Sequence, residues 1–324
     1  YYASRGLGDV YKRQTKPFND ISGVMTELQN ALACAQRVFD FIDEDPILPD
    51  APDAVTLPHG AGSVEFEHVK FRYVPDVPLI EDMNLRVQPG QRIALVGPTG
   101  CGKTTLVNLL MRFYEINGGT LKVDGHPIDT VTRDSLRGNL GMVLQETWLK
   151  AGTVADNIAY GKPDATREEI IDAAKRARAH NFICRLPQGY DTPVGELGDT
   201  LSGGERQLML LGRALIQNAH TLIMDEPTAS LDYGNSFRVM QRIESLSAGG
   251  YSVIFSTHEP NQAFRYATKV LALKNGRVLA FGPPADVLTP ELLEALYGVR
   301  VAVTQVLAGG RSFSVCTPYG GEEL

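Results

Sequence analysis

The stretch GPTGCGKTT, residues 97–105, constrains the fold of this chain more than any other part of its sequence. It follows the apolar run IALV, residues 93–96, and combines three glycines with one lysine. Glycine loses more conformational freedom on folding than any other residue, so a glycine-rich loop is expected where bare backbone approaches a ligand. The pattern G-x4-G-K-[ST] between an apolar strand and a helix indicates a phosphate-binding P-loop.

The predicted ligand of this loop is a nucleotide held with Mg²⁺. Backbone N–H groups at a helix N-terminus converge on phosphate oxygens, and the helix dipole favours negative charge there. Lys103 is expected to reach the β- and γ-phosphates, and the Thr104 hydroxyl is expected to bind Mg²⁺. The Cys101 thiol lies near the helix N-terminus, where a lowered pKa is expected. The predicted phosphate-binding residues are Gly97, Pro98, Thr99, Gly100, Cys101, Gly102, Lys103, Thr104 and Thr105.

Composition narrows the classes of protein. The 324 residues are 43% hydrophobic and 21% charged, as in ordinary globular proteins, and the net charge of −7 provides no basic field for nucleic acid. The four cysteines form no CxxC pair, which argues against a zinc site or a disulfide framework. No uninterrupted apolar stretch reaches the length of about 18 residues that a membrane span needs, so no transmembrane span is predicted.

The N-terminal part has three sections. Residues 1–14 have no clear periodicity and are expected to be a non-native leader from cloning or a disordered native terminus. Apolar residues then recur at steps of three and four between positions 18 and 42, which predicts an amphipathic helix. Residues 43–62 contain four prolines and read as a linker.

From residue 63 onward, strand and helix patterns alternate, which predicts an α/β domain with a mostly parallel sheet. Residues 63–73 alternate in polarity, and the apolar runs at 92–96, 221–225, 252–257 and 269–273 read as buried strands. Helices are predicted at 104–114 and at 166–186, where Thr166 and Glu169 fit a capping box.

The stretch TLIMDEP, residues 221–227, supplies two carboxylates at the end of a predicted strand. Asp225 matches a Walker B aspartate, which holds Mg²⁺ directly or through water. Glu226 follows it and is placed to polarise an attacking water near the γ-phosphate. Together with the P-loop, this pair favours catalysis over binding alone.

The stretch LSGGERQ, residues 201–207, precedes a helical run to residue 216 and ends 18 residues before the Walker B residue Asp225. With this stretch, the sequence resembles the ATP-binding cassette (ABC) ATPases of membrane transporters, whose signature is LSGGQ. The resemblance implies that Ser202, Gly203, Gly204 and Glu205 complete the ATP site of a partner subunit.

The same resemblance assigns single residues elsewhere in the chain. Tyr73 matches the aromatic residue that stacks on adenine, and Gln145 matches the glutamine that touches Mg²⁺ or water and senses the transmembrane partner. His258 matches the switch histidine that contacts the γ-phosphate. Asp232 belongs to the D-loop, Ser230-Leu231-Asp232.

The family's fold is implied as well: a P-loop NTPase of the RecA type, with an antiparallel β subdomain and an α-helical subdomain. The expected ATPase domain covers residues 63–324, with the helical subdomain inserted at about 146–215. Residues 15–62 resemble the end of an exporter's last transmembrane helix and its continuation toward this domain. Gly195-Glu196 matches the exporter's cross-linking loop.

The resemblance changes near residue 197. Residues 15–197 resemble exporter-type ATPases, whereas residues 198–324 resemble importer ATPases for iron–siderophore complexes or vitamin B12. This change predicts a hybrid joined near residues 190–205, from a mis-joined reading frame or an engineered fusion. A divergent native subunit is the alternative.

The function implied is ATP binding and hydrolysis that powers transport across a membrane. Glu226, His258, Lys103 and Gln145 are the predicted catalytic residues, and Thr104, Gln145 and Asp225 the predicted Mg²⁺ ligands. The implied partners are a second ABC ATPase domain, paired head to tail, and a transmembrane domain; nucleic acid is not expected. The implied location is the cytoplasmic face of a bacterial inner membrane. A soluble ABC ATPase without a transport role, and an uncoupled fragment that only binds ATP, remain alternatives.

Overall fold

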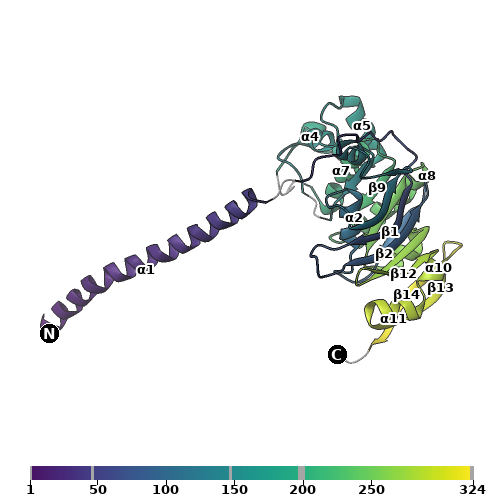
Figure 1. Ribbon diagram of the computed structural model, residues 1–324. Helices are drawn as coiled ribbons and strands as arrows, with labels where there is room; N and C mark the ends of the chain where they lie inside the picture. The colour runs from purple at the N-terminus through teal and green to yellow at the C-terminus, as the bar shows by residue number, and fades with distance from the viewer. Residues whose placement is uncertain (1, 45–46, 146–147, 196–200, 322–324) are drawn as a thin grey trace. The chain divides into compact units, whose positions relative to one another are not determined.

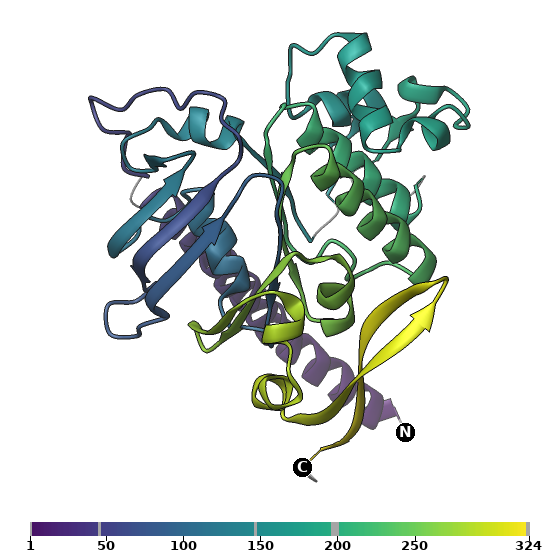
Figure 2. The same ribbon diagram turned by 90° about the vertical axis from the view of Figure 1, so that its right-hand side faces the viewer.

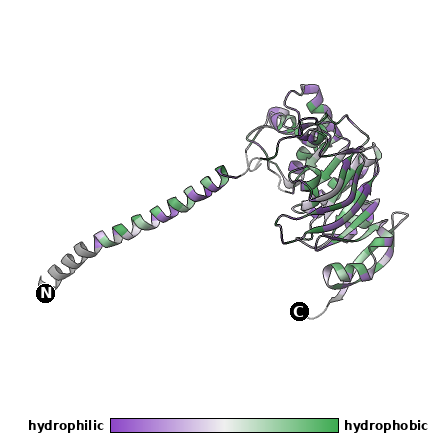
Figure 3. Ribbon diagram, viewed as in Figure 1, coloured by the Kyte–Doolittle hydropathy of each residue, from purple (hydrophilic) through white to green (hydrophobic). Residues whose placement is uncertain are grey.

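The computed structural model describes residues 2–44, 47–145, 148–195 and 201–321, and its contacts divide the chain into two units, residues 1–49 and 50–324. The first unit contains one long helix, α1 (Tyr2–Ile42), drawn in purple in Figure 1. The expected apolar stripe is present on this helix, and Figure 3 shows apolar and polar colours alternating along it. The large apolar side chains of the stripe are exposed: Ile21, Val24, Met25, Leu28, Leu32, Val38, Phe39 and Ile42.

Helix α1 begins earlier than the apolar periodicity predicts. Residues 2–14 are helical in the structure, within the segment for which the sequence predicts a non-native leader or a disordered terminus. Each residue added to an existing helix gains one backbone hydrogen bond, so extension is favoured once a nucleus exists. The helix continues past Pro17, whose nitrogen has no hydrogen to donate to the preceding turn.

A six-stranded sheet forms the centre of the second unit, with the order β12-β11-β3-β10-β9-β6. The strands β11, β3, β10, β9 and β6 run parallel to one another, and β12 pairs antiparallel to β11 at one edge. The strand bounds are β3 (Arg92–Val96), β6 (Leu140–Val143), β9 (Thr221–Met224), β10 (Ser252–Thr257), β11 (Lys269–Lys274) and β12 (Arg277–Gly282). This sheet confirms the predicted α/β class.

Both faces of the central sheet are covered. Along β3, the side chains of Ile93 and Leu95 belong to one apolar cluster, and those of Ala94 and Val96 belong to the other. Successive residues of a strand point to opposite faces, so an uninterrupted apolar run is expected only in a strand covered on both sides. The run at residues 92–96 is such a strand.

An antiparallel sheet of order β2-β1-β4-β5 contributes most of one cluster, together with α2 (Lys103–Leu110) and α3 (Arg133–Gly138). Figure 2 shows its blue strands on the opposite side of the central sheet from the teal helices of residues 154–215. Its strands are β1 (Val64–Phe71), β2 (Ile80–Val87), β4 (Gly118–Val123) and β5 (His126–Pro127).

The segment between β6 and β9 is mainly helical, although these two strands are neighbours in the sheet. The helix predicted at 166–186 is divided here into α5 and α6, because Arg178 between them has a left-handed φ of 60°. The elements are β7 (Gly152–Thr153), α4 (Val154–Ala159), α5 (Arg167–Arg176), α6 (His180–Ile183), the 3-10 helix η1 (Gly189–Asp191), β8 (Pro193–Val194) and α7 (Gly203–Leu215).

The C-terminal part adds helices to the second face of the sheet and ends in a two-stranded hairpin. The remaining elements are α8 (Tyr233–Ala248), α9 (Pro260–Tyr266), α10 (Pro284–Val287), α11 (Pro290–Tyr297), β13 (Val299–Ala308) and β14 (Arg311–Gly321). Within the described residues, no helix combines the length and the apolar character needed to cross a bilayer.

Candidate functional site

The glycine loop lies between β3 and α2, as its sequence predicts. Gly100 and Gly102 have φ values of 77° and 106°, a left-handed backbone that residues with a Cβ rarely adopt. Gly97 is fixed by space instead, because a Cβ there would lie 2.2 Å from the carbonyl oxygen of Leu273. The backbone of this loop is therefore tightly constrained at both ends.

Lys103 opens α2 and is only 6% exposed. Its Nζ donates to the carbonyl oxygens of Gly97 at 2.7 Å and Pro98 at 3.0 Å. None of the ion pairs in the described part of the chain involves Lys103. A buried ammonium is costly unless an anion balances it, so this position favours a bound anion such as a phosphate.

Thr104 and Asp225 meet although 121 positions separate them. The Thr104 hydroxyl donates to Asp225 Oδ2 at 3.0 Å, and the Ser256 hydroxyl donates to Asp225 Oδ1 at 2.6 Å. Asp225 is 7% exposed and follows β9 directly. Hydroxyl and carboxylate oxygens are the ligands that Mg²⁺ prefers, usually with one or two carboxylates and substrate phosphates. The residues present therefore fit Mg²⁺ beside a nucleotide.

Glu226 and His258 also come together. The distance from His258 Nδ1 to Glu226 Oε2 is 3.5 Å. The side chain of His258 is 52% exposed, and that of Glu226 is 19% exposed. Glu226 has a φ of 43°, and its backbone N–H donates to Ser256 Oγ at 2.7 Å. Left-handed conformations of residues other than glycine cluster at active sites. The two predicted catalytic side chains therefore face one another beside the Thr104–Asp225 pair.

Tyr73 approaches the P-loop helix from the antiparallel sheet. Its hydroxyl donates to Thr105 Oγ1 at 3.2 Å, and its ring contacts those of Phe71 and Tyr114 edge to face. The side chain remains about half exposed. A half-exposed aromatic ring has surface available for stacking.

Gln145 follows β6, and β6 pairs in parallel with β9, where Val143 lies opposite Met224. The exposed Gln145 and Asp225 therefore lie beyond the carboxyl ends of neighbouring strands. Ligands of open α/β sheets bind at such ends.

The signature stretch begins α7. The Ser202 side chain accepts from the Glu205 backbone N–H, and Glu205 Oε2 accepts from the Ser202 backbone N–H at 2.9 Å, which forms a capping box. Gly203 and Gly204 occupy the first turn, and a Cβ on Gly204 would lie 2.6 Å from Asn235 Cγ. Among the described residues, no hydrogen bond or ion pair joins positions 202–205 to the P-loop.

Asp232 caps α8, and its carboxylate accepts from the Asn235 backbone N–H at 2.9 Å. This hydrogen bond holds the pKa of Asp232 below its usual value. Because Asn235 also abuts Gly204, the starts of α7 and α8 are packed together. Glu196 of the predicted cross-linking loop lies outside the described residues, as do residues 196–200 of the predicted join, whose origin stays a prediction.

The expectation for Cys101 needs correction. Its side chain is 2% exposed, and burial raises the pKa of the Cys101 thiol even though the Lys103 ammonium nearby lowers it. Proximity to a helix N-terminus is visible in the sequence, whereas burial among non-local neighbours is not.

Ser256 is a site residue that the sequence analysis missed. It bonds both the Asp225 carboxylate and the Glu226 backbone. Its signal was a polar residue directly after the apolar run VIF, residues 253–255, and two positions before His258.

The chain is similar in sequence to known proteins. Residues 80–229 match the family model described as ABC transporter. A "Fatty acid ABC transporter ATP-binding/permease protein" of Mycobacterium bovis is 43% identical over 279 residues, which cover 86% of this chain and 44% of that protein. An "ATP-dependent lipid A-core flippase" of Syntrophus aciditrophicus is 42% identical over 267 residues, 82% of this chain and 44% of that protein.

A solved structure is similar as well. The "Structure of a bacterial Atm1-family ABC exporter with ATP bound" superposes with a TM-score of 0.72 and 35% identity, covering 83% of this chain and 48% of that chain. The chain thus spans less than half the length of these relatives. The chain carries the ATP-binding domain of the ABC transporter family, in the form found in exporter-type relatives.

Proposed function

We propose that this chain binds and hydrolyses ATP and that a transmembrane partner uses the resulting movement for transport. The observation that carries the proposal is the buried Lys103, whose Nζ donates to two carbonyl oxygens and lies 3.9 Å from Cys101 Sγ. A triphosphate supplies the negative charge that this ammonium lacks within the chain.

In this proposal, the chain holds the nucleotide at its two ends. The Tyr73 ring stacks on the adenine base, while Lys103 and the N–H groups of residues 97–105 bind phosphate oxygens. Thr104, Gln145 and Asp225 hold Mg²⁺. When bound, Mg²⁺ supplies positive charge that neutralises the developing charge on the β- and γ-oxygens.

Glu226 is the proposed general base. Its carboxylate accepts a proton from the attacking water, and His258, 3.5 Å away, contacts the γ-phosphate. Ser256 holds the backbone of Glu226 and the carboxylate of Asp225 in fixed positions. Catalysis of this kind depends mainly on positioning and electrostatics.

The proposed active unit is a head-to-tail pair of ATPase domains on the cytoplasmic face of a bacterial inner membrane. Residues 202–205 and Asp232 of one protomer complete the site at the P-loop of its partner. Relatives named ATP-binding/permease proteins support a transmembrane partner. The transported substrate is left unassigned, because membrane segments select it.

Replacing Glu226 tests the proposal. Glu226→Gln removes the proton acceptor and keeps the shape of the side chain, so phosphate release is expected to fall by about 100-fold or more. Binding of a fluorescent ATP analogue is expected to remain, because Lys103 and the loop are intact. Glu168→Gln, on the exposed first turn of α5, is the matched control. Unchanged turnover in Glu226→Gln would remove Glu226 from the role of base.

A further inference from the structure

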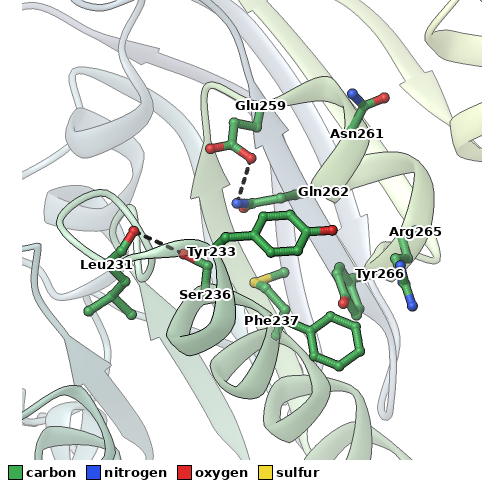
Figure 4. Close-up of a pocket in the computed structure, with 10 residues that line it drawn as sticks. Leu231, Tyr233, Ser236, Phe237, Glu259, Asn261, Gln262, Arg265 and Tyr266 are labelled. Atoms are coloured by element: carbon green, nitrogen blue, oxygen red, sulfur yellow. Dashed lines mark hydrogen bonds between the residues drawn. The ribbon is translucent and has the colours of Figure 1, made fainter. Parts of the chain in front are cut away.

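Gln262 connects two loops of the site, although the proposed mechanism gives it no role. It lies in the first turn of α9, four residues after His258, and lines the pocket drawn in Figure 4. Its Oε1 accepts from the hydroxyls of Thr228 at 3.2 Å and Thr257 at 3.1 Å. Its Nε2 donates to Thr228 Oγ1 at 3.0 Å and to Glu259 Oε2 at 2.9 Å, the latter bond drawn in Figure 4.

The two threonines place these bonds next to the reacting groups. Thr228 lies two residues after Glu226, and Thr257 directly precedes His258. Thr257 is 3% exposed, so its bond to Gln262 is shielded from water. A single amide therefore joins the loop of the proposed base to the loop of the switch histidine.

These two loops need such a connection. The direct contact between Glu226 and His258 is long at 3.5 Å, and His258 is half exposed. Glu226 keeps its left-handed backbone through the Ser256 hydroxyl on the neighbouring strand. Reacting groups must be held closely in their productive geometry, and a shift of about 1 Å costs on the order of 100-fold in rate.

The C-terminal hairpin holds α9 from its other side. Asn261 Nδ2 donates to the Cys316 carbonyl at 3.1 Å, and the Cys316 N–H donates to Asn261 Oδ1 at 2.7 Å. The Arg265 guanidinium lies 5.1 Å from the ring of Phe313 on β14 and 5.0 Å from the ring of Phe237 on α8. The helix that carries Gln262 is thus held by contacts with both the hairpin and α8.

We propose that Gln262 is a positioning residue that holds Glu226 and His258 in their relative places for ATP hydrolysis. The inference rests on the proposed roles of those two residues. Gln262 acts through Thr228 and Thr257, and in the described part of the chain no hydrogen bond joins it to the P-loop. Its loss is therefore expected to affect turnover and leave nucleotide binding intact.

The first test separates kcat from KM. Gln262→Ala is expected to lower kcat for ATP hydrolysis by about 10- to 100-fold and to change KM for ATP by less than about twofold. Thr257→Val removes one of the hydroxyl donors while keeping its shape, and its kcat is expected to fall in the same way. Gln241→Ala, on the exposed face of α8, is the matched control and is expected to behave as wild type.

The second test does not depend on turnover. In the NMR spectrum of histidine-labelled protein, the imidazole signal of His258 is assigned by its loss in His258→Ala. Gln262→Ala is expected to shift or broaden this signal, and Gln241→Ala is expected to leave it in place. A kcat within twofold of wild type, or an unmoved His258 signal in folded Gln262→Ala, overturns the proposal. A wild-type chain without ATPase activity contradicts the proposed function instead, and the His258 signal then still decides the role of Gln262.

Discussion

At the residue scale, Lys103 shows how the loop positions a cationic group for an anion. Its ammonium is satisfied by the dipoles of two carbonyl groups, so it remains in place without a carboxylate partner. Carbonyl dipoles stabilise a cation less than a full negative charge does. The difference is available as binding energy when a phosphate takes the place beside Lys103.

Cys101 makes the corrected expectation measurable. Cys101 and Cys316 are buried, and burial raises the pKa of both thiols, whereas Cys34 and Cys184 are exposed. The reacting species is the thiolate. The exposed Cys34 and Cys184 are therefore expected to react with an aromatic disulfide reagent at pH 7 about ten times faster than the buried Cys101 and Cys316, or faster still. Denaturant should make all four thiols fast. Mass spectrometry identifies the sites, and early labelling of Cys101 would contradict its burial.

Single residues of the site differ in how well the sequence predicts them. Lys103, Thr104, Asp225 and Glu226 belong to short motifs at strand ends, and parallel strands bring such ends to one edge of the sheet. Gln262 belongs to no motif. Its contacts depend on how α9 lies against two loops, so the sequence contains no local sign of its position.

At the element scale, an ion-pair cluster holds residue 50 against the ATPase domain. Asp50 Oδ1 lies 2.6 Å from Arg133 Nη1 and 3.5 Å from Arg112 Nη1, and Glu115 Oε1 bonds the same two arginines. Both guanidinium groups are nearly buried. The segment expected to be a linker is therefore packed where it enters this domain, and Leu57 is also buried in the domain.

Asp50 predicts a pH dependence of stability. The Arg133 N–H and guanidinium hold the pKa of Asp50 below its usual value, which is also its value in the unfolded chain. The carboxylate thus contributes stability above about pH 4, and this contribution is lost as the pH falls through the lowered folded-state pKa. Urea unfolding at pH 7 is expected to show Asp50→Asn destabilised by about 1–2 kcal/mol. The difference in the free energy of unfolding between Asp50→Asn and the wild type is expected to decrease below pH 4.

Asp53→Asn serves as the control for this experiment, since Asp53 is exposed and close in sequence. It is expected to match the wild type throughout the pH range. If the difference in unfolding free energy between Asp50→Asn and the wild type stays constant from pH 3 to pH 7, the charge of Asp50 is not the cause of the destabilisation.

The elements themselves were predicted unevenly. The strands at 92–96 and 252–257 and the Thr166–Glu169 capping box agree with the structure, because apolar runs and caps are local signals. The helix predicted at 104–114 ends at Leu110, where Arg112 takes a φ of 50° and its side chain bonds the carbonyls of Ile128 and Val131. That ending results from contacts between distant segments. The local sequence pattern therefore does not predict the end of this helix.

At the scale of the whole molecule, the site divides between two places. The P-loop, Asp225, Glu226 and His258 converge, whereas Ser202 to Glu205 bond one another and the start of α8 lies beside them. The N-terminus of α7, where the helix dipole favours negative charge, is suited to an anion. In the proposed head-to-tail pair, the triphosphate held by the P-loop of one copy lies against the N-terminus of α7 of the other copy.

If two copies pair around ATP, the mass of the particle in solution is expected to increase when ATP is bound. Glu226→Gln retains ATP, so with Mg²⁺ and ATP its mass in light scattering is expected to rise from 35.3 kDa toward twice that value. Adding Gly203→Asp is expected to keep the protein monomeric. A Cβ at Gly203 would lie 3.3 Å from Leu231 Cδ2, so that side chain must shift slightly. An acidic residue in the first turn of α7 interacts favourably with the helix dipole, whereas its charge repels the partner's γ-phosphate. Gly138→Asp, where a Cβ meets no atom within 4 Å, controls for the added charge. A Gly203→Asp protein that still pairs would place the signature loop outside the ATP interface.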